Sequence, residues 1–278
     1  MKIGIIGLGL MGGSIAKTAK KRELAQVYGI DVPEVMQKAV LLNAIDGELN
    51  EKTISKVDLL FICAYPRQIP DILREYVPKV KDGCIVCDIG GNKRLIVQAM
   101  ENLSKEYPNV NFVASHPMAG REFVGISHSI TTLYDKSSFI IIPVKSSLEA
   151  TQTLSDFIRA LGATNVEYTS ADNHDDMIAY TSQLCHVISS AYVKNKKSQN
   201  HFGYSAGSFK DLTRVAKLNP VMWSENMIDN RDYLVKDIDI LIEELKKYRE
   251  ALATNNQVGL EELLREGTII KENLKDKK

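Results

Sequence analysis

The sequence has no excess of charge of either sign, since 35 lysine and arginine residues balance 35 aspartate and glutamate residues. Nucleic acids and anionic membrane surfaces attract proteins with a basic excess, so we expect neither as a partner. The chain also lacks an apolar run long enough to cross a bilayer, and it starts directly in an apolar strand pattern rather than in a signal peptide. These absences lead us to expect a cytoplasmic protein without a membrane segment.

Cysteine is also scarce, and its distribution does not resemble a disulfide framework. Cys84 and Cys87 have the spacing of half a zinc site, but they fall in an apolar run that predicts a strand. Residues three apart on a strand point to opposite faces, and no second pair of ligands follows. We therefore expect Cys63, Cys84, Cys87 and Cys185 to be buried or half-buried thiols, and we expect no metal site.

The sequence does contain alternating strand and helix patterns over its first 170 residues. This alternation predicts an α/β fold with a doubly wound, mostly parallel sheet. The runs that we interpret as strands are Lys2–Ile6, Gln26–Ile30, Asp58–Ala64, Cys84–Cys87, Asn111–Ala114, Ser138–Pro143 and Asn165–Glu167. At 278 residues the chain is long enough for a second domain. We place a Rossmann-type domain over residues 1–170 and an all-helical domain over residues 171–278.

The second part of the chain shows helical patterns only. One long pattern runs from Asp172 to about Asn195. Further on, apolar residues recur at alternating spacings of four and three, which predicts a seam between packed helices. The members of this seam are Leu234, Ile238, Leu241, Leu245, Tyr248 and Leu252. A helical domain this small has several such stripes to cover, so we expect two subunits to pair through it as a homodimer.

A glycine pattern follows the first strand and opens a helix, as in dinucleotide-binding folds, although such a pattern alone also occurs in turns of other α/β folds. Gly7 permits the tight turn, Gly9 lets the backbone approach a pyrophosphate, and Gly12 lets helix and strand pack closely. Asp31 ends the second strand about twenty residues further on, where a carboxylate binds ribose hydroxyls and repels a 2′-phosphate. We therefore predict NAD rather than NADP. The expected cofactor contacts are Gly7, Leu8, Gly9, Leu10, Met11, Gly12, Asp31, Ala64, Tyr65, Pro66 and Gly90.

A second polar motif, Ser115–Glu122, follows the strand predicted over Asn111–Ala114. In an open α/β sheet, cofactor and substrate meet beyond the carboxyl ends of the strands. His116, which Pro117 follows, is thus expected in a loop where it can take a proton beside a nicotinamide. A loop histidine without a chemical role is the alternative interpretation.

The most specific pattern of the chain consists of five segments that span nearly its whole length. They are Gly7–Ser14, His116–Gly120, Thr181–His186, Gly207–Arg214 and Pro220–Trp223. In this order they resemble the prephenate dehydrogenases and arogenate dehydrogenases of tyrosine biosynthesis. The glycine motif is shared by many dehydrogenases, whereas the other four together are specific. The resemblance implies a Rossmann domain followed by a helical domain through which two subunits pair.

The resemblance also implies an activity, the oxidative decarboxylation of a cyclohexadienol, prephenate or arogenate, to a phenol. In the family's pattern His116 is the catalytic histidine that hydrogen-bonds the ring 4-hydroxyl, Arg214 binds a substrate carboxylate, and His186 is a histidine on the substrate side. Aromatisation drives the loss of CO₂, so NAD is the one cofactor required and no metal is needed. The further substrate-binding positions are Ser182, Gln183, Arg121, Glu122, Gly207 and Trp223.

The chain departs from the family's pattern at four positions near the expected site, one of which is Arg121 in place of a small polar residue. Gly91 stands where the family has a serine that contacts the catalytic histidine or the substrate. Its absence leaves Asn92 or a water molecule to orient His116. Gln183 replaces the first histidine of the family's helix motif, and Cys185 replaces its proline.

Three alternatives to a prephenate dehydrogenase remain open. Arogenate carries an amino group where prephenate carries a keto group, and the positive charge of Arg121 favours prephenate. A β-hydroxyacid dehydrogenase shares the glycine start and a helical second domain, but it takes its proton with a lysine, and Asp172–Val193 contains none. The third alternative is a non-catalytic NAD-binding protein on the same fold.

Overall fold

The computed structural model describes residues 1–274, which form two compact units. The first unit contains residues 1–177 together with 219–229, and the second contains residues 178–218 together with the chain from Asn230 on. The first unit therefore includes a short helix, α10 (Pro220–Asp229), from within the segment predicted as helical domain. The chain accordingly passes from one unit to the other three times.

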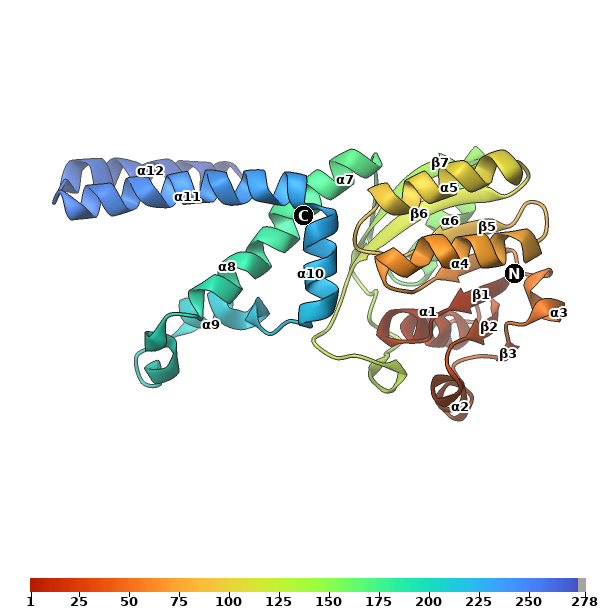
Figure 1. Cartoon of the computed structure of the whole chain (residues 1–278). Helices are drawn as coiled ribbons and strands as arrows, with labels where there is room; N and C mark the ends of the chain where they lie inside the picture. Colours follow the sequence, from red (N-terminus) through yellow and green to blue (C-terminus); the bar gives the residue numbers. More distant parts are fainter. Residues whose placement is uncertain (275–278) are drawn as a thin grey trace. The chain divides into compact units, whose positions relative to one another are not determined.

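The first unit is built on one sheet, which has eight strands within the described residues (Figure 1). In chain order they are β1 (Lys2–Ile6), β2 (Gln26–Ile30), β3 (Gly47–Glu48), β4 (Leu59–Ile62), β5 (Ile85–Asp88), β6 (Asn111–Met118), β7 (Ser138–Lys145) and β8 (Asn165–Tyr168). Their order across the sheet is β3-β2-β1-β4-β5-β6-β7-β8. Neighbouring strands are parallel except for β6 and β7, which pair antiparallel. The predicted α/β class with a doubly wound, mostly parallel sheet is confirmed.

Helices cover both faces of this sheet, so side chains on both faces of the central strands are buried. The helices of the unit, besides α10, are α1 (Leu10–Lys21), α2 (Pro33–Leu41), α3 (Glu51–Ile54), α4 (Ile69–Tyr76), α5 (Arg94–Glu106), α6 (Leu148–Ala160) and α7 (Ala171–Ile178). In β4, Leu59 and Phe61 belong to the core beneath α1 and α6, whereas Leu60 and Ile62 belong to the core beneath α4 and α5. The continuous apolar run that predicted β4 is thus explained by burial on two sides.

Strand β6 is longer than the apolar run that predicted it. The sequence predicted that the strand ends at Ala114 and that His116 lies in the following loop. In the structure β6 continues to Met118, and His116 lies within it, opposite Ile140 of β7. The antiparallel strand β7 forms backbone hydrogen bonds with the polar end of β6. The local sequence pattern of β6 does not predict this pairing, because it depends on a strand further along the chain. The backbone of His116 is therefore held in the sheet.

The cysteines support the strand assignment and correct one expectation. Cys84 and Cys87 are buried free thiols in the cores on opposite faces of the sheet, and burial raises the pKa of each to about 12. Cys63 is half-buried, also as expected. Cys185 is exposed, because the neighbouring Leu184 takes the buried position at that point of the helix, so the prediction of a covered thiol is wrong there.

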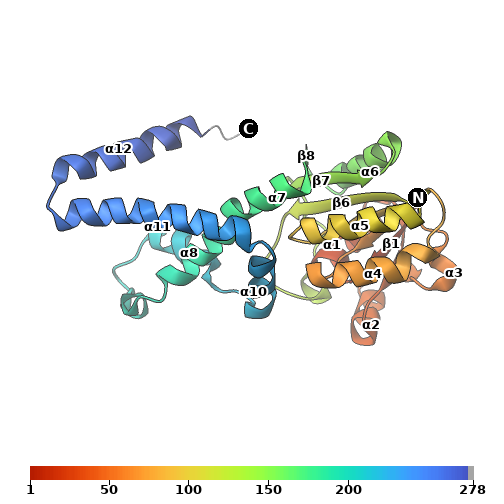
Figure 2. The same ribbon diagram turned by 45° about the horizontal axis from the view of Figure 1, so that its top comes forward.

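The second unit is helical throughout its regular elements. They are a π-helical turn (Ala179–Leu184), α8 (Cys185–Tyr192), two 3₁₀ turns (Lys196–Asn200 and Arg214–Ala216), α9 (Gly207–Thr213), α11 (Arg231–Ala253) and α12 (Gln257–Asn273). α11 and α12 form an antiparallel pair (Figure 2). Between them the phenol of Tyr248 donates to the carbonyl of Leu263 at 3.2 Å. None of the helices within residues 1–274 combines the length and the apolar composition needed to cross a membrane.

The predicted apolar seam of α11 is covered in part: Leu234 is buried, and Ile238, Leu241 and Tyr248 are half-buried. Leu234 is 5% exposed, whereas Leu245 and Leu252 are 58% and 65% exposed. A single chain therefore leaves much of this stripe in contact with solvent.

Candidate active site

The glycine loop at the carboxyl end of β1 has the geometry that its sequence predicts. Gly7 has φ +91°, and a Cβ there would lie 2.3 Å from the carbonyl oxygen of Cys63. A Cβ on Gly12 would lie 2.0 Å from the carbonyl oxygen of Gly7, so helix α1 can approach this loop only with glycine at that position. The space beside Gly9 is open for 4 Å. The loop is thus tight on its protein side and accessible at Gly9.

Asp31 fixes the glycine loop to the end of β2. Its carboxylate accepts hydrogen bonds from the backbone N–H of Leu8 at 2.6 Å and of Val32 at 2.7 Å. The strand order reverses between β1 and β4, so this loop and the Ala64–Pro66 loop after β4 share the switch point where doubly wound folds bind ligands. The predicted cofactor residues of these loops are therefore at one edge of the sheet.

The helix α10 is fastened to two loops of that edge. Arg67, directly after Pro66, makes a two-pronged ion pair with Asp229, at 2.7 and 2.9 Å. Asn92, after β5, donates its side-chain amide to the carbonyl of Asn226 at 2.8 Å. Trp223, predicted to bind substrate, lies half-buried on the same helix.

His116 is the first member of a hydrogen-bonded row of three side chains. Its Nδ1 lies 2.9 Å from Nε2 of His174, and Nδ1 of His174 lies 2.7 Å from a carboxylate oxygen of Asp175. Asp175 in turn accepts the backbone N–H groups of Lys93, at 2.8 Å, and Arg94, at 3.0 Å, at the beginning of α5. His174 and Asp175 were not predicted as site residues from the sequence. Their signal was an adjacent His-Asp pair in the first turns of a predicted helix, but its contact with His116 spans 58 residues.

A buried ion pair lies beside this row. Lys93 and Asp88 are both fully buried, with Nζ 2.5 Å from the carboxylate. The same ammonium group donates to the carbonyl of Ser115 at 2.5 Å, and Asp88 also accepts the N–H of Gly90 at 2.6 Å. A positive charge is thus held at the carbonyl of Ser115, the residue that precedes His116.

These surroundings favour neutral imidazole rings. Burial, followed by repulsion from His174 when that ring is protonated and from the charge of Lys93, lowers the pKa of His116 well below 6.5. Burial also lowers the pKa of His174, although its hydrogen bond to Asp175 opposes this shift. Burial alone would raise the pKa of Asp175, but hydrogen bonds from His174 and from the N–H groups of Arg94 and Lys93 hold it below the usual value. At neutral pH the row therefore consists of two neutral rings and a carboxylate.

Gly91, which stands where the family has a serine, has free space around it in the structure. The nearest atom to a Cβ on Gly91 would be the side-chain nitrogen of Asn226, at 3.9 Å. The expected substitute, Asn92, donates to helix α10 instead, and His174 provides the hydrogen bond to His116.

Arg121 and Glu122 lie on an exposed loop after β6. The Arg121 guanidinium lies 5.0 Å from the ring centre of Phe123 and donates to the carbonyl of His128 at 3.2 Å. Phe123 in turn stacks on the His128 ring. The loop thus holds a cationic group at the protein surface.

The remaining predicted substrate residues lie in the second unit. His186 is hydrogen-bonded through Nδ1 to the carbonyl of Val215, at 3.0 Å, which fixes α8 to the turn that carries Arg214. Gln183 is buried in the π-helical turn and accepts a hydrogen bond from Asn230 at 3.0 Å. Ser182 is half-buried in the same turn, and Gly207 is exposed at the beginning of α9. π-helical turns are frequent at functional sites, and the apolar spacing of this segment predicted an ordinary α-helix.

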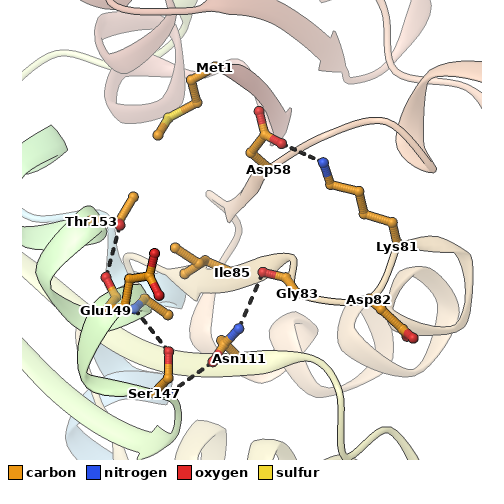
Figure 3. A pocket seen from close by; sticks show the side chains of 11 residues that line it. Met1, Asp58, Lys81, Asp82, Gly83, Ile85, Asn111, Ser147, Glu149 and Thr153 are labelled. Atoms are coloured by element: carbon orange, nitrogen blue, oxygen red, sulfur yellow. Dashed lines mark hydrogen bonds and ion pairs between the residues drawn. The ribbon is translucent and has the colours of Figure 1, made fainter.

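A separate cavity of about 410 Å³ lies at the opposite, amino-terminal edge of the sheet (Figure 3). Its lining includes Met1, Asn111 and Ser147, together with an ion pair between Asp58 and Lys81 at 2.5 Å. It is thus separate from the row that ends at His116.

Comparisons with known proteins identify the family. The family model described as "Prephenate dehydrogenase, nucleotide-binding domain" matches residues 15–167, and "Prephenate dehydrogenase, dimerization domain" matches residues 170–266. The chain belongs to the prephenate dehydrogenase family. The predicted family is thereby confirmed.

Several family members are similar over most of their length. A cyclohexadienyl dehydrogenase of Zymomonas mobilis is 32% identical over 91% of this chain and 89% of its own length. A prephenate dehydrogenase of Bacillus subtilis is 28% identical over 88% of this chain and 68% of its own length. The crystal structure of prephenate dehydrogenase from Aquifex aeolicus, in complex with hydroxyphenyl propionate and NAD⁺, has a TM-score of 0.86, 28% identity and 99% coverage of both chains.

Proposed function

We propose that this chain catalyses the NAD-dependent oxidative decarboxylation of prephenate to 4-hydroxyphenylpyruvate in tyrosine biosynthesis. The observation that carries the proposal is the placement of His116, half-buried near the carboxyl end of a strand in the dinucleotide-binding unit, with its Nδ1 2.9 Å from Nε2 of His174. The family relative with NAD⁺ and hydroxyphenyl propionate bound supports both the cofactor and a hydroxyphenyl compound as ligand. Arogenate is the second candidate substrate, and the exposed cationic group of Arg121 favours prephenate over it.

The glycine loop fits a dinucleotide. A pyrophosphate can approach the open side of Gly9 and the N–H groups at the beginning of α1. We assign Asp31 to the ribose hydroxyls, and its negative charge disfavours the 2′-phosphate of NADP. The loops that carry Ala64–Pro66 and Gly90 complete the proposed cofactor contacts. NAD⁺, when bound, accepts a hydride.

We assign His116 Nε2 as the acceptor of the substrate's hydroxyl proton. As hydride leaves the ring carbon that bears the hydroxyl, that carbon becomes a carbonyl carbon and the proton is released to the imidazole. The bond from the ring to its carboxylate then breaks, CO₂ departs, and the electron pair enters the ring. The ring becomes aromatic, and its oxygen takes the proton back from His116 as a phenol forms.

We assign the remaining predicted residues to holding the substrate. Arg214 would bind a carboxylate with its planar fork, and His186 would lie on the substrate side. The further positions are Ser182, Gln183, Arg121, Glu122, Gly207 and Trp223.

We also propose that two copies pair through the domain over residues 171–278, and that the enzyme acts in the cytoplasm. The exposed Leu245 and Leu252 support pairing, as does the description of the matching family model as a dimerization domain. The free thiols of Cys84 and Cys87 support a reducing compartment.

Initial rates of cofactor reduction test the proposed function. We expect the highest kcat/KM for prephenate with NAD⁺, a lower value for arogenate, and none for a β-hydroxyacid such as 3-hydroxyisobutyrate. NADP⁺ should be the poorer cofactor because Asp31 repels its 2′-phosphate. No reduction with either cyclohexadienol would contradict the proposal, and equal or better turnover with NADP⁺ would contradict the assignment of Asp31.

Arg214→Ala tests the carboxylate assignment through KM. Arg214 is exposed and makes no ion pair within its own unit in the described chain, so the variant should fold with an unchanged Tm. Loss of a charge-assisted pair of about 1.5–3 kcal/mol corresponds to a roughly ten- to hundredfold rise in KM for prephenate. Arg214→Lys should recover only part of the affinity. Arg265→Ala removes another exposed arginine of the same unit and should leave KM unchanged. An unchanged KM in folded Arg214→Ala would exclude Arg214 from the site.

A further inference from the structure

We propose that His174 and Asp175 are positioning residues, which fix the hydrogen of His116 on Nδ1 and leave Nε2 as its proton acceptor. Both residues lie on α7, in the same compact unit as His116. The tautomer is a property of the protein alone, whereas its use in catalysis rests on the proposed function.

The donor and acceptor of each hydrogen bond in the row follow from the carboxylate of Asp175. An ionised carboxylate can only accept hydrogen bonds, and Asp175 already accepts two backbone N–H groups. The hydrogen in its contact with His174 must therefore belong to Nδ1 of that ring. A neutral imidazole carries one hydrogen, so Nε2 of His174 is an acceptor and Nδ1 of His116 must donate to it.

The charged groups around the two histidine rings stabilise this arrangement of the hydrogen atoms. They are Asp175 on α7, Lys93 before α5, and Asp88 at the end of β5. Asp175 attracts the hydrogen of His174, while the buried Lys93 disfavours a second proton on either ring. Asp88 holds the Lys93 ammonium group in place, at 2.5 Å.

The hydrogen bond from His116 to His174 orients the His116 ring, which Gly91 cannot do because it has no side chain. Asn92 donates to the carbonyl of Asn226 instead. His174 is fully buried and is itself fixed by Asp175, so it can act as a rigid acceptor. With the backbone of His116 held between β6 and β7, both the position and the tautomer of its ring are determined.

Nitrogen NMR of the ¹⁵N-histidine-labelled, substrate-free protein tests the tautomer directly. At pH 7 we expect His116 to carry its hydrogen on Nδ1, with Nε2 unprotonated. A hydrogen on Nε2, or a charged ring, would overturn the proposal. Because no substrate is present, this result is independent of whether the chain oxidises prephenate.

Two substitutions of His174 test the positioning role. In His174→Gln the amide can still donate to Asp175 and accept from His116, so we expect the tautomer and most of kcat to be retained. In His174→Phe the ring shape remains without nitrogen atoms, and kcat should fall at least about tenfold, towards the 10²–10⁴-fold that general-base catalysis supplies. KM should change little in both.

In His174→Phe, the ¹⁵N NMR signals of His116 should show a mixture of the two tautomers, because no acceptor then fixes the hydrogen on Nδ1. Equal kcat for the two variants and the native protein, or an equal loss in both, would overturn the positioning role. Should His174→Phe not fold, a hydrogen on Nε2 of His116 in the native protein, or a large loss of kcat in folded His174→Gln, would still overturn the proposal.

Discussion

Replacement of His116 by asparagine is expected to lower kcat for prephenate by about 100- to 10,000-fold, the factor that a general base supplies. Asparagine can hydrogen-bond the substrate's hydroxyl but cannot take its proton, so KM should change little. Stopped-time or continuous assays of NADH formation measure both constants.

The matched control is His201→Asn, which changes an exposed histidine that is not among the assigned site residues and should leave kcat unchanged. Near-native turnover of His116→Asn would show that His116 is not the base.

Lys93→Met is expected to give the largest loss of stability, about 3–5 kcal/mol in the free energy of unfolding. Its partner Asp88 is fully buried, and the substitution would leave that carboxylate without its counter-charge. Urea unfolding measures the change. Adding Asp88→Asn should recover part of the stability, because the uncompensated charge is then removed.

The matched control for this prediction is Lys81→Met. Lys81 makes an ion pair with Asp58 at the same distance of 2.5 Å, but both side chains are about 40% exposed. Exposed pairs contribute about 0–1 kcal/mol, so the control should cost little. A similarly small loss in Lys93→Met would contradict the view that the buried pair is essential to this part of the unit.

Local features of the first unit could be predicted from the sequence. The glycine loop combines a positive φ at Gly7 with a close approach at Gly12, and both requirements act within a few residues. The strands β4 and β5 are buried on both faces of the sheet, and their apolar runs reflect this burial. Such a strand can be predicted without knowing which helices or strands pack against it.

Contacts between distant segments could not be predicted. The extension of β6 past His116 depends on pairing with β7, and the burial of Lys93 depends on Asp88 and Ser115. The partner of His116 comes from α7, after two further strands have been added to the sheet. A histidine on a helical pattern carries no local sign of such a contact.

The family resemblance identified residues that periodicity alone would not single out. Arg214 and His186 were chosen by motif, and the structure adds that the backbone next to Arg214 is held by His186. The exposure of Leu245 and Leu252 in the α11 seam was not predicted. The spacing of apolar residues predicts which face of a helix is apolar, but not how much of that face is buried within one chain.

The pH dependence of kcat/KM for prephenate tests most directly the central claim that a neutral His116 takes the substrate's proton. Burial, repulsion from a protonated His174 and the charge of Lys93 lower the pKa of His116, and the unprotonated ring is the active form. As the pH falls from 8, kcat/KM should therefore stay constant through 6.5 and decline only well below it. A decline centred at or above pH 6.5 would contradict the account.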